Sequence, residues 1–189
     1  SANQDVTISG VNGAPTARDD HATTDEDHSG TITLGNKIAG IPDASGMDTD
    51  PDGDPLHVTD VNLAATPITL TGTGSLALSD VSIVKLTNVD PNYVAGSVAT
   101  FQVTTADNLD AGTDPQVAYI YINANGDEFL INSSDAFDQL SASQSLKFNF
   151  TYDISDGNGG TASANQDVTV TGINDDPTAR DGHATTDAE

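Results

Sequence analysis

The chain has 189 residues, of which 29 are acidic and 5 are basic, and its formal net charge is −24. A field of this sign repels nucleic acid and anionic membrane surfaces, so we expect neither as a partner. The sequence contains no cysteine, which excludes disulfide bonds and thiolate chemistry. The apolar fraction of 35% is mostly Val, Ile, Leu and Ala among many Thr, Ser, Asn, Asp and Gly. This composition is typical of short strands joined by turns and favours an all-β sandwich.

An internal repeat defines the organisation of the chain. The stretch "SANQDVTISGVNGAPTARDDHATTDED" at residues 1–27 returns as "SANQDVTVTGINDDPTARDGHATTDAE" at residues 163–189, an offset of 162. This self-similarity predicts a tandem array. We therefore expect residues 1–11 to be the last strand of a preceding repeat, 12–173 to form one complete module, and 174–189 to start the next. Neither a signal peptide nor a membrane-spanning stretch is evident, and both ends read like mid-protein sequence, so we expect a piece of a longer protein.

Alternating and apolar segments predict the strands of the module. Turn-forming clusters, "NANGDE" at 123–128 and "SDGNGG" at 155–160, separate several of them. The segment "SSDAFDQLSA" at 133–142 predicts one helical turn, with Ser134 or Asp135 as its N-cap. The predicted strands lie near residues 16–20, 30–34, 56–63, 81–86, 98–104, 117–123, 146–154 and 162–172.

One loop concentrates negative charge. In "DTDPDGDPL" at 48–56, aspartates alternate at Asp48, Asp50, Asp52 and Asp54. Two such carboxylates about 5 Å apart repel by roughly 3 kcal/mol at an effective dielectric constant near 20, so the loop needs a cation or open solvent. The alternation matches the first half of a calcium-binding loop. Position 12 is Thr59 rather than a bidentate Glu, and the flanks predict strands, so a helix-loop-helix site is not expected.

An ion-free turn is the alternative for such loops. It applies to the aspartate-rich loop at 48–54, because Asp and Gly are common in turns. It applies more strongly to "DISDGNGG" at 153–160, because Asp-Gly and Asn-Gly are ordinary hairpin formers.

Three blocks carry a family resemblance. They are "APTARDDHATTDEDHSGTITL" at 14–34, "DTDPDGDPLHVTDV" at 48–61 and "FTYDISDGNGGTASANQDVTVTGINDDP" at 150–177. Together they resemble the cadherin-like, VCBS-type repeats of giant bacterial surface adhesins of the RTX family. The resemblance implies a Greek-key, Ig-like or cadherin-like β-sandwich that binds calcium and functions in cell adhesion and biofilms. It also implies type I secretion to the extracellular surface of a bacterium. No resemblance covers about 64–118, and typical members are shorter, so an insertion is expected there.

Greek-key topology would gather acidic residues at both ends of the sandwich. It would bring the loop carboxylates Asp48, Asp50, Asp52 and Asp54 near Asp153, Asp156 and Asn158, beside the incoming linker at Asn12. The opposite end would gather Asp25, Glu26 and Asp27 beside the outgoing linker with Asn174, Asp175 and Asp176. Asp19 and Asp20, at the predicted first strand, complete the candidate ligand set.

Calcium suits these candidates, because it accepts six to eight oxygen ligands in adaptable geometry, whereas zinc prefers nitrogen or sulfur. The four histidines, His21, His28, His57 and His183, have no paired metal spacing and are expected to be surface residues. The two copies of the linker differ, since "VNGAP" lacks both acids of "INDDP". An ion at the first junction should therefore bind more weakly.

These observations predict a calcium-rigidified extender module of a secreted bacterial adhesin. We expect a monomer that contacts the neighbouring repeats of its own chain, while distal domains bind the host or surface ligand. The alternative is that the insertion is a calcium-dependent carbohydrate- or peptide-binding module. An enzyme is not expected, because no nucleophile elbow, His-centred triad spacing or isolated acid pair stands out. The Thr-rich "TLTGTGS" at 69–75 could suggest ice binding, but one short run better fits an ordinary strand and turn.

Overall fold

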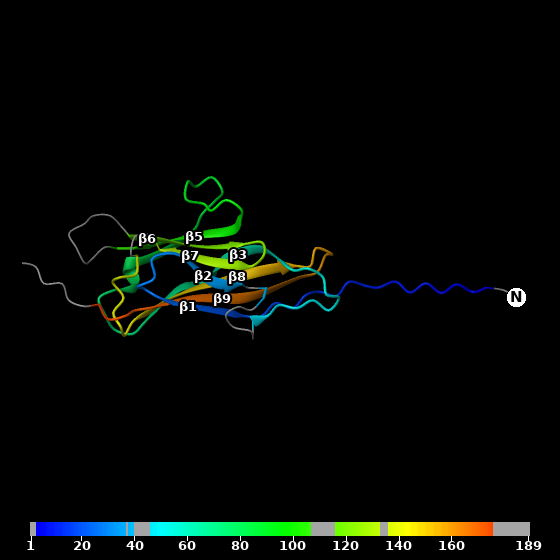
Figure 1. Cartoon of the computed structure of the whole chain (residues 1–189), viewed down its shortest axis with the longest axis horizontal. Helices are drawn as coiled ribbons and strands as arrows, with labels where there is room; N and C mark the ends of the chain where they lie inside the picture. Colours follow the sequence, from blue (N-terminus) through cyan, green and yellow to red (C-terminus); the bar gives the residue numbers. More distant parts are fainter. Residues whose placement is uncertain (1–2, 37, 40–45, 107–115, 133–135, 176–189) are drawn as a thin grey trace, which may run out of the picture.

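The protein is an all-β sandwich in which two sheets pack face to face (Figure 1). The computed structural model describes residues 3–36, 38–39, 46–106, 116–132 and 136–175. The composition predicted an all-β sandwich and the resemblance implied an Ig-like one, and the two-sheet arrangement is consistent with both. A short 3₁₀ helix, η2 (Leu78–Asp80), precedes β4. The strands are β1 (Asp20–Asp25), β2 (Gly30–Asn36), β3 (His57–Thr71), β4 (Val81–Lys85), β5 (Ser97–Thr105), β6 (Gln116–Asn123), β7 (Asp127–Asn132), β8 (Ser145–Ser155) and β9 (Thr161–Thr171).

The sheets contain four and five strands, in the orders β1-β9-β8-β3 and β2-β7-β6-β5-β4. The first strand, β1, pairs with the last, β9, in parallel. The other strand pairs of the described chain are antiparallel. Strands β1 and β3 lie in the four-stranded sheet and β2 in the other, so the chain crosses between the sheets twice. The loops before β1, before β3 and between β8 and β9 consequently lie at one end of the sandwich. We call this the N-terminal end, and the opposite one the C-terminal end.

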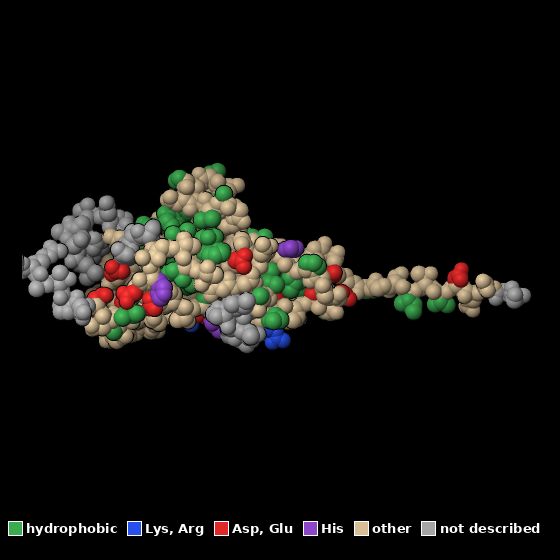
Figure 2. Space-filling view, in the orientation of Figure 1, with side chains coloured by type: hydrophobic (Ala, Val, Ile, Leu, Met, Phe, Trp, Pro, Cys, Tyr) green, Lys and Arg blue, Asp and Glu red, His purple; other side chains and the backbone are tan. Residues whose placement is uncertain are grey.

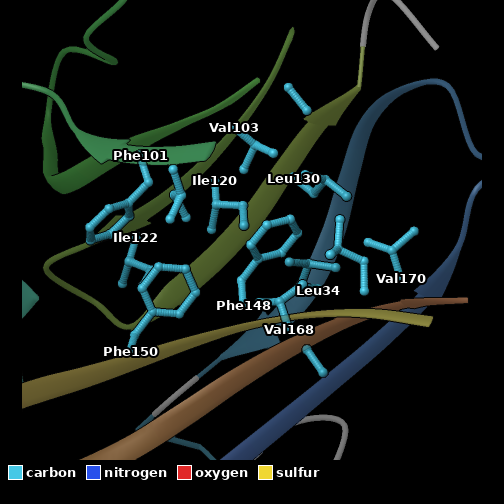
Figure 3. Close-up of a cluster of buried hydrophobic side chains, with 14 of the residues drawn as sticks. Leu34, Phe101, Val103, Ile120, Ile122, Leu130, Phe148, Phe150, Val168 and Val170 are labelled. Carbon is cyan, nitrogen blue, oxygen red and sulfur yellow. The ribbon is translucent and has the colours of Figure 1, made fainter. Parts of the chain in front are cut away.

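Inward-facing side chains of both sheets form one core. Strand β8 alternates perfectly between half-buried and buried positions, as expected for a strand with one face on a core. Phe148 and Phe150 of β8 are fully buried, and the Phe150 ring centroid lies 4.7 Å from that of Phe101 on β5. Burial of a side chain of this size contributes about 1.5–3 kcal/mol. Figure 3 shows these rings beside Ile120 and Ile122 of the five-stranded sheet.

The N-terminal arm, residues 3–11, extends away from the sandwich (Figure 1). Its apolar side chains are exposed, with Val6 at 78% and Ile8 at 91%. Their repeat equivalents in β9, Val168 and Val170, are fully buried. No helix in the described part of the chain is long and apolar enough to span a membrane.

Several predicted elements differ from the observed ones. The predicted strand at 16–20 is wrong, because β1 begins only at Asp20 and Thr16 makes a single bridge with Thr49. Strand β7 was not predicted, and β3 extends eight residues beyond the predicted end. The predicted helical turn at 133–142 is not formed at 136–142, where the chain makes turns, and 133–135 lie outside the described residues.

The stretch that lacks a family resemblance, 64–118, is built into the sandwich. It contains the second half of β3, then η2, β4 and β5, and the beginning of β6. Strand β5 lies between β6 and β4 and buries Phe101 and Val103 completely. Residues 107–115 lie outside the described part. The strands of this stretch thus contribute to the hydrophobic core, whereas the loop between β4 and β5 is largely exposed.

Candidate metal sites at the two ends of the sandwich

The aspartate loop at 50–54 folds around one carboxylate. Oδ1 of Asp50 accepts hydrogen bonds from the backbone N–H groups of Asp52 at 2.8 Å and Asp54 at 3.1 Å. Gly53 has a φ of 76°, in the left-handed region that favours glycine. This turn brings one carboxylate oxygen each of Asp50, Asp52 and Asp54 within 4.8 Å of one another. Each such pair of charges repels by about 3 kcal/mol at an effective dielectric constant near 20.

The same loop contacts the incoming linker and the β8–β9 turn. The Asn158 amide donates to Asp54 Oδ2 at 2.8 Å, and the Gly13 N–H donates to Asp52 Oδ2 at 2.7 Å. The Asn12 amide in turn donates to Asp156 Oδ2 at 2.8 Å. Three segments far apart in sequence therefore meet at the N-terminal end, as the Greek-key argument predicted.

Asp156 is fixed by the turn that contains it. Its Oδ1 accepts from the N–H groups of Asn158 and Gly160, at 2.8 and 2.9 Å. The Asn12 amide, with these backbone donors, holds the pKa of Asp156 below its usual value. A Cβ at Gly160 would lie 2.1 Å from Asp156 Oδ2, so a larger residue would displace the carboxylate. Asp156 is thus ionised, and its carboxylate is held in a fixed orientation that suits a metal ligand.

The donor set at this end fits a hard cation. The cluster found in the described residues consists of the carboxylates Asp50, Asp52 and Asp54, with the oxygens of Asp156 and Asn158 nearby, and oxygen ligands are what calcium prefers. Oδ2 of Asp50 is buried and has no hydrogen-bond partner among the described residues. Buried polar atoms are normally paired, so an unpaired carboxylate oxygen beside two further carboxylates has the chemistry of a cation ligand.

Asp48 and Asp20 occupy a different place from the aspartate loop. Both are buried, at 6% and 4% exposure. Asp48 Oδ1 accepts a hydrogen bond from the backbone N–H of Arg18 at 2.8 Å. The Tyr152 hydroxyl lies between the two carboxylates, 3.1 Å from Asp48 Oδ1 and 3.4 Å from Asp20 Oδ2. Burial raises the pKa of Asp48 to about 6, although the bonds from Arg18 and Tyr152 oppose the shift. Burial and the two carboxylates also raise the pKa of Tyr152.

The prediction that Asp48 shares a cluster with its alternating neighbours therefore does not match its contacts, because its carboxylate is buried and bonded to the Arg18 N–H and the Tyr152 hydroxyl. Asp153 also has other partners, since it accepts a hydrogen bond from the Ser163 hydroxyl across β8 and β9, at 2.5 Å. Asp19 accepts from the backbone N–H of Asn165 at 2.8 Å. No hydrogen bond found in the described chain joins Asp153 or Asp19 to the aspartate loop.

The C-terminal end contains a buried glutamate. Glu26 is 2% exposed. Its backbone N–H donates to the Thr171 carbonyl at 3.1 Å, and its side-chain Oε1 accepts a hydrogen bond from the Ile173 N–H at 2.5 Å. Oε2 is buried with no hydrogen-bond partner among the described residues. Burial raises the pKa of Glu26 to about 7, against the Ile173 bond, and the charges of Asp175, Asp138 and Asp27 add to the shift.

Glu26 thus lies against the outgoing linker, as predicted. Asp25 instead binds the ring of His28, and the Asn174 amide donates to the Asp175 carbonyl at 3.3 Å. Asp176, also predicted here, lies outside the described residues. Asp138 was not predicted, because the turn between β7 and β8 carries no metal-binding pattern. Figure 2 shows acidic side chains near both ends of the sandwich.

The fold defines the class of this protein as an all-β, Ig-like sandwich with a carboxylate cluster at its N-terminal end and a buried glutamate, Glu26, at its C-terminal end. Comparison with known proteins identifies no matching family model, no matching curated protein and no matching solved structure.

Proposed function

We propose that the chain is a calcium-binding extender module of a secreted bacterial cell-surface adhesin, in which calcium rigidifies the loops and the junctions between modules. One observation carries the proposal. Carboxylate oxygens of Asp50, Asp52 and Asp54 lie within 4.8 Å of one another, and their loop is hydrogen-bonded to the incoming linker at Gly13. A cation here would remove the mutual repulsion and fix the linker to the module at the same time.

The residues that would hold calcium at the N-terminal end are the three loop aspartates, with Asp156 and Asn158 beside them. The ion would supply charge neutralisation and cross-linking, and no catalytic chemistry is assigned to it. Two of its ligand segments, 50–54 and 156–158, belong to the sandwich, and the linker at 12–13 is bonded to both. The direction of the linker would thus be set by the occupied site.

The charge of the whole chain supports folding that depends on external calcium. At a net charge of −24, the chain repels itself wherever calcium is scarce, which would keep it extended during secretion. Extracellular modules bind calcium with dissociation constants of about 0.1–1 mM, so binding and folding would follow release from the cell. The alternative of a separate carbohydrate- or peptide-binding insertion has less support, because the strands within 64–106 belong to the two sheets of the sandwich.

Calcium titration with thermal melting tests this function. Saturation at 100 times the dissociation constant adds about 2.7 kcal/mol per site, and each kcal/mol raises the melting temperature by about 2–4 °C at this size. We expect chelator to lower the melting temperature by at least about 5 °C. An unchanged melting temperature would refute the calcium function.

A matched pair of variants tests the site. Asp50→Asn keeps the Oδ1 acceptor that organises the loop and removes the charge. Asp90→Asn makes the same change at a loop aspartate that accepts two hydrogen bonds from Thr87, at 2.6 and 2.8 Å, away from the carboxylate cluster. By isothermal titration we expect Asp50→Asn to weaken calcium binding at least tenfold and Asp90→Asn to leave it unchanged. Equal effects would indicate diffuse screening and no localised site.

A further inference from the structure

The first and last strands of the module are paired to each other, in parallel. Six residue pairs join β1 to β9, from Asp20 opposite Gln166 to Asp25 opposite Thr171. Because the two strands run in the same direction, the start of β1 and the end of β9 lie at opposite ends of the sandwich. The chain therefore enters at one end, through the arm, and leaves β9 at the other (Figure 1).

This geometry determines how tension would act on the module. A pull on the two ends of the chain drives β1 and β9 past each other along their own axes. The hydrogen bonds of the parallel ladder are evenly spaced and share such a load, so they must fail together. If the strands were pulled apart from one end, the bonds would break one after another, and each bond alone resists only weakly.

Side chains reinforce the ladder along its whole length. At its start, Asp19 Oδ1 accepts from the Asn165 N–H at 2.8 Å. Along it, the His21 ring lies 2.6 Å from Asp167 Oδ2. At its end, the buried Glu26 carboxylate accepts from the Ile173 N–H. These bonds join residues of the β1 segment to residues of the β9 segment, so all of them oppose the same sliding motion.

The ladder is also protected from water on its inner face. Ala22 of β1 and Val168 and Val170 of β9 are at most 1% exposed. In the described sheet β1 has β9 as its one neighbour, whereas β9 is also paired with β8 over eleven residues. Separation of β1 from β9 is therefore the first step of extension from the ends, and it uncovers the core.

We propose that the β1–β9 ladder is a mechanical clamp, which gives the module a load-bearing function under end-to-end tension. This function goes beyond calcium binding and needs only neighbours at both ends, which the repeat of 1–27 at 163–189 predicts. Calcium at the linkers would set the direction in which tension enters, and the clamp would set the tension at which the module opens.

Single-molecule pulling on the full chain, with calcium present, tests the clamp. The chain has no cysteine, so thiol handles can be placed uniquely. Handles at Ser9→Cys and Glu189→Cys load the ladder in the sliding direction. Handles at Ser29→Cys, just beyond β1, and Glu189→Cys peel β1 from β9 starting at their shared C-terminal end. At equal loading rate we expect the first geometry to need at least twice the rupture force, because forced unfolding reports the barrier and not the equilibrium stability.

Two histidine variants assign the resistance to the ladder. His21→Ala removes a contact between the β1 and β9 strands, whereas His28→Ala removes the ring that binds Asp25 only three residues away. We expect His21→Ala to lower the rupture force in the sliding geometry and His28→Ala to leave it unchanged. Equal rupture forces in the two pulling geometries, or equal effects of the two variants, would overturn the clamp. A failure of calcium binding alone would leave the difference between the geometries intact.

Discussion

The buried carboxylate of Glu26 should make the calcium-free module less stable as pH rises. Burial raises the pKa of Glu26 from 4.5 to about 7, so between these values the folded chain binds more protons than the unfolded chain. Stability therefore falls as pH rises through this window, by on the order of 3 kcal/mol for this group. Below pH 4.5 Glu26 is protonated in both the folded and the unfolded chain, so it does not lower the free energy of unfolding. Above pH 7 it is ionised in both states, and the full cost of burying the charge lowers that free energy.

Glu26→Gln isolates this contribution. The glutamine oxygen can still accept from the Ile173 N–H, and the neutral side chain resembles protonated glutamate. In calcium-free buffer we expect the variant to be more stable than the wild type by roughly 3 kcal/mol at pH 8 and equally stable at pH 4.5. Urea unfolding followed by circular dichroism from pH 4.5 to 8 measures both curves.

A control separates burial from general charge. Asp27→Asn removes a carboxylate one residue away that is exposed, and it should change the curve only slightly. With calcium at saturation, the wild type should gain more stability than Glu26→Gln, because the ion would occupy the place of the proton. If Glu26→Gln keeps the pH dependence of the wild type between pH 4.5 and 7, the buried-carboxylate argument is refuted.

Further predictions concern two glycine turns and the first linker. Gly72 has a φ of 84° and a Cβ there would lie 1.7 Å from the Ser143 carbonyl oxygen, whereas Gly96 has a φ of 86° and open space. Gly72→Ala should therefore cost roughly 3–5 kcal/mol and Gly96→Ala only about 1–2 kcal/mol in urea unfolding; equal costs would contradict this packing. At the first linker, a Cβ on Gly13 would lie 3.1 Å from Pro51 Cγ, while Ala14 is exposed. Ala14→Asp should raise calcium affinity in isothermal titration, and Gly13→Asp should lower calcium-free stability by about 1–3 kcal/mol; a fully stable Gly13→Asp would contradict the crowding.

The sequence predicted strands best where their inward positions are apolar. The predicted strand at 146–154 matches β8 within one residue at each end, and its buried positions are Leu, Phe, Tyr and Ile. Strand β7 was missed because two of its three buried positions are polar, Glu128 and Asn132. Apolar residues therefore do not recur at every second position, which is the pattern that predicts a strand. Strand β1 buries one apolar residue, Ala22, and its position is set by pairing with β9 and not by its own pattern.

The candidate site at the N-terminal end was predictable in outline from the residue pattern and the topology. Alternating aspartates with a glycine predict a turn, and the topology predicts which loops meet. The separation of Asp48 from Asp50 was not predictable, because both occupy the same alternating pattern. The bridge between Thr16 and Thr49 and the hydroxyl of Tyr152, which is distant in sequence, direct Asp48 inward.

The repeat shows most directly that neighbours decide structure. Eight of residues 1–10 are identical to their counterparts in 163–172, and Val6 and Ile8 of the arm correspond to Val168 and Val170. In β9 these positions are fully buried between β1 and β8, and in the arm they are 78% and 91% exposed. The linker that follows the arm is bonded to the aspartate loop and bridged to Thr49, which directs the arm away from its own sandwich. Among the described residues, no strand pairs with this segment, although its sequence is that of a central strand. This agrees with the hypothesis that it completes the sheet of a preceding repeat.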